Sequence, residues 1–243
     1  MVVGRRPALE AVRSGRATEV LVSGTARSTT GLREVVEAAG SAGVPVRTVT
    51  DDQVESLAHG ERHQGVAARV SLPPPLDEAA LGSRPWSDDA LVVVLDGVTD
   101  PHNLGAVART AEAAGAEALV IRRRRGASVG PAAVRASAGA LAHLPVAEVA
   151  NLPRALGRLR DARFWVVGLD AGGEGTIDAE RPPGRLAMVL GSEGEGLSRL
   201  VARSCDEVLS IPLRGMVGSL NVSVAAGVGL FAYAVRGNGK RRT

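Results

Sequence analysis

The chain has 243 residues, which is enough for one large domain or two smaller ones. Hydrophobic residues make up 45% and charged residues 23%, a balance that excludes a disordered chain, and no apolar run is long enough to cross a bilayer. The first six residues carry two arginines and no apolar signal segment, so we expect a soluble cytoplasmic protein. Cys205 is the only cysteine, which excludes an internal disulfide and a cysteine metal cluster, and we expect it to be a small core residue.

The charge is distributed unevenly over a chain whose formal net charge is +3. Residues 1–88 hold 10 Arg and 11 Asp plus Glu, a net charge of −1, whereas the remainder has a net charge of +4. Much of the excess lies in the run Arg122–Arg125 and in the tail Lys240–Arg242. Concentrated arginine favours contact with phosphate. A solvated loop and a frayed tail are the alternative interpretation.

Residues 1–72 show short elements of alternating type, which predicts a small α/β domain. The predicted helices are 6–13, 31–39 and 51–58, and the predicted strands are 19–22, 45–49 and 65–70. Three consecutive prolines, Pro73–Pro75, then break both helix and sheet. We therefore predict a domain over 1–72, a linker over 73–88 that continues irregularly through Gly82–Trp86, and a second domain over 89–243.

The second domain again alternates strand and helix, a pattern typical of a mostly parallel sheet with helices on both faces. The predicted strands are 91–96, 117–121, 144–149, 164–169, 186–190 and 207–211. The predicted helices are 103–114, 130–141, 152–160, 195–203 and 220–235.

Three connections from a strand to a helix carry polar residues that could perform chemistry. The first contains Asn103, expected at the cap of a helix, and Arg109, expected on its second turn. The second is the glycine-rich stretch Gly191–Gly196, which holds Glu193. The third begins at Ile211 and leads to Ser219-Leu-Asn-Val-Ser, in which Ser219 is a suitable N-cap for the last helix. Taken singly, each could be an ordinary turn or cap.

Together, in this order and spacing, the three motifs resemble the signature motifs of the SpoU, or TrmH-like, RNA ribose 2′-O-methyltransferases. The resemblance implies a C-terminal SPOUT domain with a parallel sheet, knotted as a deep trefoil, that binds S-adenosylmethionine in the knot. The segments Gly4–Ala11 and His63–Ala68 resemble the ends of the small N-terminal substrate-binding domain of this family, which is similar to ribosomal protein L30e.

The resemblance also implies roles for individual residues. It places Arg109, Asn103, Glu193, Ser219 and Asn221 at the catalytic site. It places Leu169, Leu190, Gly191, Gly196, Ile211 and Leu220 around the cofactor. Glu193 would orient Arg109, and Asn103 would orient Arg109 or the ribose. Because a guanidinium stays protonated and has no acceptor, we expect Arg109 to hold a phosphate and stabilise the developing alkoxide rather than to act as a base. For contact with RNA we select Arg5, Arg6, Arg62, Arg123 and Arg124.

Other kinds of site are not supported by the sequence. No G-x-G-x-x-G motif follows the first strand of the second domain, the four histidines form no zinc-ligand spacing with Cys205, and aromatic residues make up only 2% of the chain. The leading hypothesis is a homodimeric RNA 2′-O-methyltransferase that uses S-adenosylmethionine, binds no metal and no membrane, and most resembles the RlmB-type enzymes acting on a guanosine of 23S rRNA. A tRNA 2′-O-methyltransferase of the TrmH type and a catalytically silent RNA-binding protein remain the alternatives. The apolar helix 222–235, with small residues such as Ala226 and Gly229, is the expected dimer contact.

Overall fold

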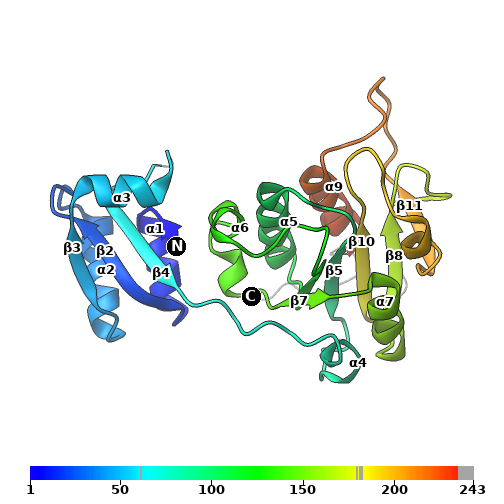
Figure 1. Ribbon diagram of the computed structural model, residues 1–243, viewed down its shortest axis with the longest axis horizontal. Coiled ribbons are helices and arrows are strands. Elements are labelled where there is room, and N and C mark those ends of the chain that lie inside the picture. Colours follow the sequence, from blue (N-terminus) through cyan, green and yellow to red (C-terminus); the bar gives the residue numbers. More distant parts are fainter. Residues whose placement is uncertain (61, 179, 181–182, 235–243) are drawn as a thin grey trace. The chain divides into compact units, whose positions relative to one another are not determined.

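The computed structural model describes residues 1–60, 62–178, 180 and 183–234. Within this part the chain forms two compact units (Figure 1): Met1–Pro73 with Ala138–His143, and the chain from Pro74 onward apart from those six residues. The basic tail Lys240–Arg242 lies outside the described residues. No helix in the described ranges is long and apolar enough to cross a membrane.

The N-terminal unit is a four-stranded sheet in the order β1-β4-β2-β3. Its strands are β1 (Val2–Val3), β2 (Ala17–Ser23), β3 (Val46–Val49) and β4 (Val66–Val70), and its helices are α1 (Arg5–Arg13), α2 (Thr30–Ser41) and α3 (Asp51–Ala58). β2 and β3 are parallel, whereas β4 pairs antiparallel with both β1 and β2. The six elements predicted here are confirmed, and only the two-residue β1 was missed. Thr50 caps α3 with a capping box shared with Gln53.

The C-terminal unit is built on a seven-stranded sheet in the order β7-β6-β5-β10-β8-β11-β9, and every pairing in it is parallel. The strands are β5 (Leu91–Leu95), β6 (Ala118–Arg122), β7 (Val146–Val149), β8 (Trp165–Leu169), β9 (Gly175–Thr176), β10 (Leu186–Leu190) and β11 (Glu207–Ser210). The six predicted strands are confirmed. The two-residue β9 was missed because so short a pairing leaves no apolar pattern.

The helices of this unit are α4 (Ala80–Ser83), α5 (Pro101–Ala113), α6 (Pro131–Ala136), α7 (Leu152–Asp161), α8 (Arg199–Ala202) and α9 (Val222–Gly229), which a π-helical turn extends over Leu230–Ala234. The helix predicted over 130–141 is shorter, because Ala138 and Gly139 adopt positive φ angles of 49° and 99° that no α-helix accommodates. The helix predicted over 195–203 is reduced to α8, since its first residues belong to the glycine-rich loop. Residue 235 of the last predicted helix lies outside the described residues.

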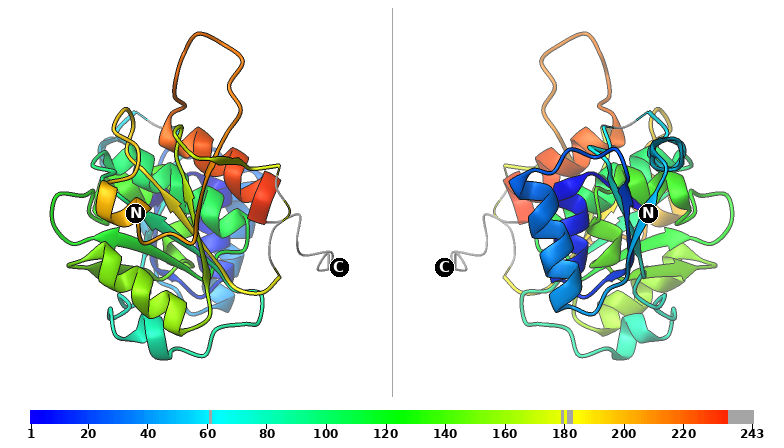
Figure 2. Two further views of the ribbon diagram at one scale, coloured as in Figure 1. Left: turned by 90° about the vertical axis from the view of Figure 1, so that its right-hand side faces the viewer. Right: turned by 90° about the vertical axis from the view of Figure 1, so that its left-hand side faces the viewer.

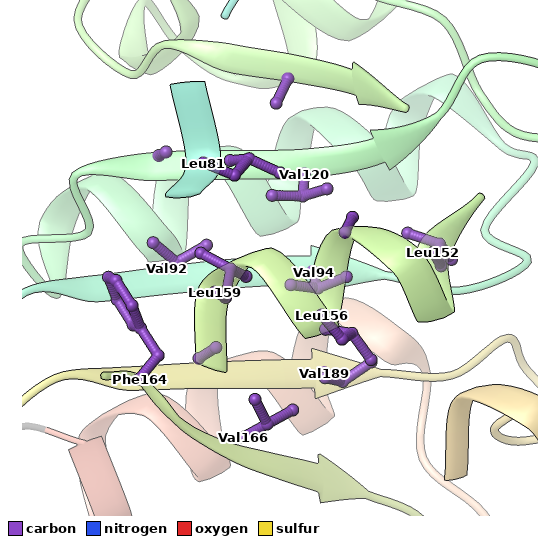
Figure 3. Packing of buried hydrophobic residues seen from close by; sticks show 14 of the residues in the cluster. Leu81, Val92, Val94, Val120, Leu152, Leu156, Leu159, Phe164, Val166 and Val189 are labelled. Atoms are coloured by element: carbon purple, nitrogen blue, oxygen red, sulfur yellow. The ribbon is translucent and has the colours of Figure 1, made fainter. Parts of the chain in front are cut away.

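The main core lies between the sheet and α7. Figure 3 shows Leu152, Leu156 and Leu159 of α7 over the valines of neighbouring strands. The central strands β5, β6 and β10 are buried on both faces, as parallel strands covered by helices require. This is why they read as continuous apolar runs in the sequence.

The second half of the predicted linker is ordered and packs into this core. Leu81 of α4 is fully buried, and the Trp86 ring makes an edge-to-face contact with Phe164 at 5.2 Å between ring centroids. Glu78 accepts hydrogen bonds from Arg154 of α7 at 2.5 and 3.1 Å. The segment Gly82–Trp86 was expected to be irregular. Its first two residues belong to α4, and its apolar side chains pack into the core beside α7.

The last strand of the sheet is inserted between two strands formed earlier in the chain. β11 lies between β8 and β9, so the short connection from Asp170 to Glu174 crosses it. Gly173 allows this crossing, since a Cβ atom there would lie 2.5 Å from the carbonyl carbon of Leu209. Beyond β11 the chain forms a loop that extends away from the unit before it returns as α9 (Figure 2). The crossing fits the expected knotted fold.

Candidate active site

The loops that carry the three sequence motifs lie together at the carboxyl ends of the parallel strands, where open α/β sheets bind ligands. The second and third of these loops, together with the end of β8, line a cavity of about 340 Å³. The six residues selected for cofactor contact all line it: Leu169, Leu190, Gly191, Gly196, Ile211 and Leu220. Its size and its apolar walls with interspersed backbone are typical of a small-molecule site. The contacts of these residues with a cofactor remain a prediction.

The glycine-rich loop forms one wall of the cavity as a closed backbone ring. Ser192 and Gly196 exchange backbone hydrogen bonds of 3.0 and 3.1 Å. Gly191 packs so closely on this ring that a Cβ atom would lie 2.2 Å from the carbonyl carbon of Gly196. Gly196 itself has a φ of 65°, which residues other than glycine rarely adopt. These two glycines are therefore required by geometry, and they bring bare backbone to the cavity surface.

Two carboxylates fix the far end of this loop. β5 and β8 flank β10 in the sheet, and each is followed directly by an aspartate, Asp96 after β5 and Asp170 after β8. Asp170 Oδ2 accepts a hydrogen bond from Leu197 N at 2.6 Å, and Asp96 Oδ2 accepts one from Ser198 N at 2.8 Å. The other Asp170 oxygen accepts from Gly172 N at 2.8 Å. Neither aspartate was among the predicted site residues, although each is the first polar residue after a buried strand.

Three of the residues selected for catalysis form one hydrogen-bonded network. Asn103 Nδ2 donates to Glu193 Oε1 at 3.3 Å, and Asn221 Nδ2 donates both to that same oxygen and to Asn103 Oδ1, the latter at 3.1 Å. The backbone N–H of Val222 donates to Glu193 Oε1 at 3.3 Å. The network thus joins α5, the glycine-rich loop and the N-terminus of α9. Among the described residues, Glu193 Oε2 accepts no hydrogen bond.

The helix caps differ from those expected. α9 begins at Val222 and is capped by Asn221, whose Oδ1 accepts from Ser223 N at 2.9 Å, so the expectation that Ser219 is the N-cap was wrong. Ser219 is exposed and lines the cavity. α5 is capped by Asp100, and Asn103 lies within its first turn rather than at the cap. The N-cap role of Ser219 was predicted from the local preference of serine alone. In the folded chain the loop continues past Ser219, and Asn221 occupies the cap.

Arg109 lies apart from this network. It is exposed on the third turn of α5, not the second, and its guanidinium has no hydrogen bond or ion pair with the residues that the structure describes. It does not line the cavity. Glu193 was expected to orient Arg109, and Asn103 to orient Arg109 or the ribose, but within one chain they bind each other and Asn221 instead.

The arginines selected for RNA contact differ in their surroundings. Arg5 holds the N-terminal unit together, since its guanidinium donates to Thr29 Oγ1, to Gln64 O at 3.1 Å and to Arg27 O at 3.4 Å. Arg6, Arg62 and Arg124 are exposed. Arg123 is exposed too, and it donates to Glu148 O at 3.2 Å.

Neither metal chemistry nor cysteine chemistry is indicated in the described part of the chain. No group of three or more His, Cys, Asp or Glu residues there could hold a metal ion. Cys205 packs against the main core, as expected, and its Sγ lies 3.4 Å from Val201 O. Burial, aided by the neighbouring Asp206 carboxylate, raises the pKa of the Cys205 thiol to about 12, so it is not an activated nucleophile.

Comparison with known proteins agrees with this geometry. The model of the SpoU rRNA methylase family matches residues 90–231, and the model for the substrate-binding region of RNA 2′-O ribose methyltransferases matches residues 1–76. The chain belongs to the SpoU rRNA methylase family. The resemblance stated from the three motifs is therefore confirmed.

Individual relatives extend over nearly the whole chain. An uncharacterized tRNA/rRNA methyltransferase of Mycobacterium avium is 44% identical over 93% of this chain and 74% of its own length. The SpoU methyltransferase AviRb of Streptomyces viridochromogenes, solved in complex with AdoMet, is 29% identical with a TM-score of 0.77 over 96% of this chain and 88% of its own. A structure described as an RNA 2′-O ribose methyltransferase is 26% identical with a TM-score of 0.79 over 97% and 87%. The protein is an RNA methyltransferase that uses S-adenosylmethionine, and its α/β fold class is confirmed.

Proposed function

We propose that this SpoU family member methylates the 2′-hydroxyl of a ribose in RNA, and that its substrate is a guanosine of 23S rRNA. The observation that carries the proposal is the Asn103–Glu193–Asn221 network beside the cavity lined by Gly191, Ile211 and Leu220. A carboxylate and two amides at the mouth of a cofactor cavity suit a hydroxyl, which must lose a proton and then carry negative charge. The match of residues 1–76 to the substrate-binding region of 2′-O enzymes supports the ribose, and the resemblance to RlmB-type enzymes supports the rRNA guanosine.

The residues divide the chemistry between them. S-adenosylmethionine, when bound, supplies a methyl group on a positively charged sulfur. Apolar side chains such as Ile211 and Leu220 would enclose the adenosine, and the backbone of the glycine-rich loop would bind its polar edges. Asn103 and Asn221 hold Glu193 through its Oε1, which leaves Oε2 to receive the proton of the 2′-hydroxyl. The hydroxyl oxygen forms the bond to the methyl carbon, while the electron pair of the broken S–C bond stays on sulfur.

Arg109 would act on the site of a second copy. It has no partner among the described residues of its own chain, although guanidinium groups at such sites hold phosphate and stabilise oxyanions. Val224 and Phe231, on α9 and the turn that follows it, are 51% and 48% exposed. We therefore propose a homodimer in which α9 lies at the contact. Ala226 and Gly229, which were expected at that contact, face inward instead: Ala226 is fully buried, and a Cβ atom on Gly229 would lie 2.9 Å from Leu169 Cδ2.

Transfer of a radiolabelled methyl group from S-adenosylmethionine to unmodified 23S rRNA and to bulk tRNA tests the choice of substrate. We expect the full chain to label 23S rRNA at one position, with tRNA labelled at background. Labelling of tRNA alone would support the tRNA 2′-O-methyltransferase, a candidate that the M. avium relative's name also includes. Binding of both RNAs without transfer, by a protein that binds S-adenosylhomocysteine, would support the catalytically silent RNA-binding protein.

A further inference from the structure

A second cavity, of about 270 Å³, lies next to the glycine-rich loop, outside the carboxyl ends of β6 and β7. Its polar lining comes from Arg122, Asn151, Ser198 and Arg199, and Leu152, Pro153 and Leu200 complete its walls. No acidic side chain lines it. A cavity with two arginines and no carboxylate on its surface is suited to an anion.

One of the arginines is held in place by the buried Asp96. Arg122 Nη2 lies 3.6 Å from Asp96 Oδ1, and the carboxyl group of Asp96 is almost fully buried. This single contact leaves most of the five N–H donors of the guanidinium for another acceptor. The second arginine, Arg199, is exposed at the start of α8, and its guanidinium has no hydrogen bond or ion pair within the described ranges. The two guanidinium groups therefore outweigh the one carboxylate beneath them.

The remaining polar groups of the cavity are also donors. Asn151 Oδ1 already accepts the backbone N–H of Arg154 at 2.9 Å as the cap of the ten-residue helix α7, so its amide N–H groups remain. The Ser198 hydroxyl can donate as well. A ligand that offers only acceptors, such as a phosphate group, matches this set, whereas a cation finds no exposed acceptor of opposite charge.

The position of this cavity relates it to the active site. Glu193 lines the first cavity and Ser198 lines the second, and Ser198 lies five positions after Glu193 in the chain. A chain of that length spans at most about 18 Å. A strand of RNA that presents a ribose to Glu193 can therefore reach the second cavity within a few nucleotides.

We propose that the cavity lined by Arg122, Asn151, Ser198 and Arg199 binds a backbone phosphate of the RNA substrate near the methylated ribose. The inference rests on the proposed function, because RNA must be the molecule whose ribose lies at Glu193. Phosphate contacts fix the register and orientation of RNA without reading its sequence. The cavity thus positions the strand, while base recognition lies elsewhere.

The test compares two arginines of one helix. Arg199→Ala removes a guanidinium from the cavity, and Arg203→Ala removes one from the exposed C-terminal end of the same helix, outside the cavity lining. Arg122 is not suited to the test, because its loss would leave the buried Asp96 without a cation. Fluorescence anisotropy of a labelled 23S rRNA fragment is measured with the full chain over a series of salt concentrations.

Arg199→Ala should reduce the slope of log affinity against log salt by ~0.7–0.9, the change for one lost phosphate contact, with a several-fold loss of affinity. Arg203→Ala should leave the slope unchanged. The proposal is overturned if Arg199→Ala binds the fragment like the wild type, or if both variants lose the same amount. It is also overturned if only inorganic phosphate, and not the RNA, binds in an Arg199-dependent way.

A parallel titration with S-adenosylhomocysteine separates this proposal from the proposed function. Arg199→Ala should bind S-adenosylhomocysteine like the wild type, which shows that the variant is folded. If the wild-type protein methylated a base instead of a ribose, the proposed function would fail, yet the difference between Arg199→Ala and Arg203→Ala would still report the phosphate contact.

Discussion

Glu193 is the residue in which the structure concentrates the polar contacts of the active site. All of its hydrogen bonds from the described residues reach Oε1, from Asn103, Asn221 and the Val222 N–H. A glutamine at this position would keep an oxygen for those donors but would replace the second oxygen with an amide that accepts no proton.

We expect Glu193→Gln to lower the rate of methyl transfer by about a hundredfold or more, as for loss of a general base, while the affinity for S-adenosylhomocysteine stays close to that of the wild type. Single-turnover transfer and calorimetry measure the two quantities. Glu195→Gln, the same change two residues along the loop, is the comparison. Equal rates for Glu193→Gln and the wild type would remove the proton-accepting role.

Arg109 gives a second prediction for a single residue. Arg109→Lys keeps the positive charge but loses the planar pair of donors that binds an oxyanion and a phosphate. Transfer should fall by about a hundredfold, as for loss of a transition-state donor, and S-adenosylhomocysteine binding should be unchanged because Arg109 does not line the cavity. Near-normal turnover by Arg109→Ala would show that the assignment is wrong.

The individual site residues were predictable to different degrees. The six residues around the cavity were predicted from the resemblance to the family, whose motifs assign roles to positions along the chain. The hydrogen bonds of Glu193 with Asn103 and Asn221 could not be predicted. These two asparagines are 118 residues apart in the sequence and meet only because α5 packs against α9. Asp96 and Asp170 were missed for the same reason: their partners are backbone N–H groups of a distant loop.

Among the elements, the segment from Asp77 to Trp86 shows how a predicted linker can become part of a domain. The pKa of the Glu78 carboxyl is lowered below its ordinary value, mainly by the hydrogen bond from Arg154. Burial of the carboxyl acts in the opposite direction and raises the pKa. A carboxyl whose pKa is lowered on folding stabilises the protein above its unfolded pKa, and this contribution is lost as the pH falls through the folded pKa.

Glu78→Gln should therefore reduce the free energy of unfolding at pH 7 by about 1 kcal/mol, since a hydrogen bond to a charged partner is weakened. The difference from the wild type should shrink as the pH is lowered below the ordinary glutamate pKa of about 4.3. Urea denaturation of both proteins between pH 7 and a pH below about 4.3 measures this difference in the free energy of unfolding. Glu112→Gln, at an exposed position, is the control. A difference that did not depend on pH would mean that the ion pair with Arg154 is not the cause.

The outer side of α9 gives the prediction for assembly. Val224 is half exposed on this helix, whereas Ala226 and Gly229 face the core, so an aspartate at Val224 should disturb a contact between copies without disturbing the fold. We expect Val224→Asp to shift the protein from dimer to monomer in light scattering at low micromolar concentration and to reduce methyl transfer with it. Thr18→Asp on β2, an exposed position of the other unit, should change neither. A wild-type monomer that methylates RNA would remove the dimer and the shared Arg109.

For the whole molecule, the alternation of strands and helices was enough to predict two α/β units and a parallel sheet, because strands buried on both faces are visible as apolar runs. The order of the strands was not predictable in the same way. Hydrophobic pattern does not indicate that β11 enters between β8 and β9, and only the resemblance to a knotted family pointed to such a crossing. The close approach of Gly173 to Leu209 is the local mark of that topology.

The proposed function requires that the methyl group goes to a ribose oxygen. Nuclease digestion of RNA methylated by the full chain, followed by mass spectrometry of the nucleosides, tests it most directly, with alkaline hydrolysis of the same RNA in parallel. A 2′-O-methyl group removes the hydroxyl that attacks the adjoining phosphodiester in alkali, so we expect 2′-O-methylguanosine and one alkali-resistant dinucleotide. A methyl group found on a base, with every phosphodiester cleaved by alkali, would contradict it.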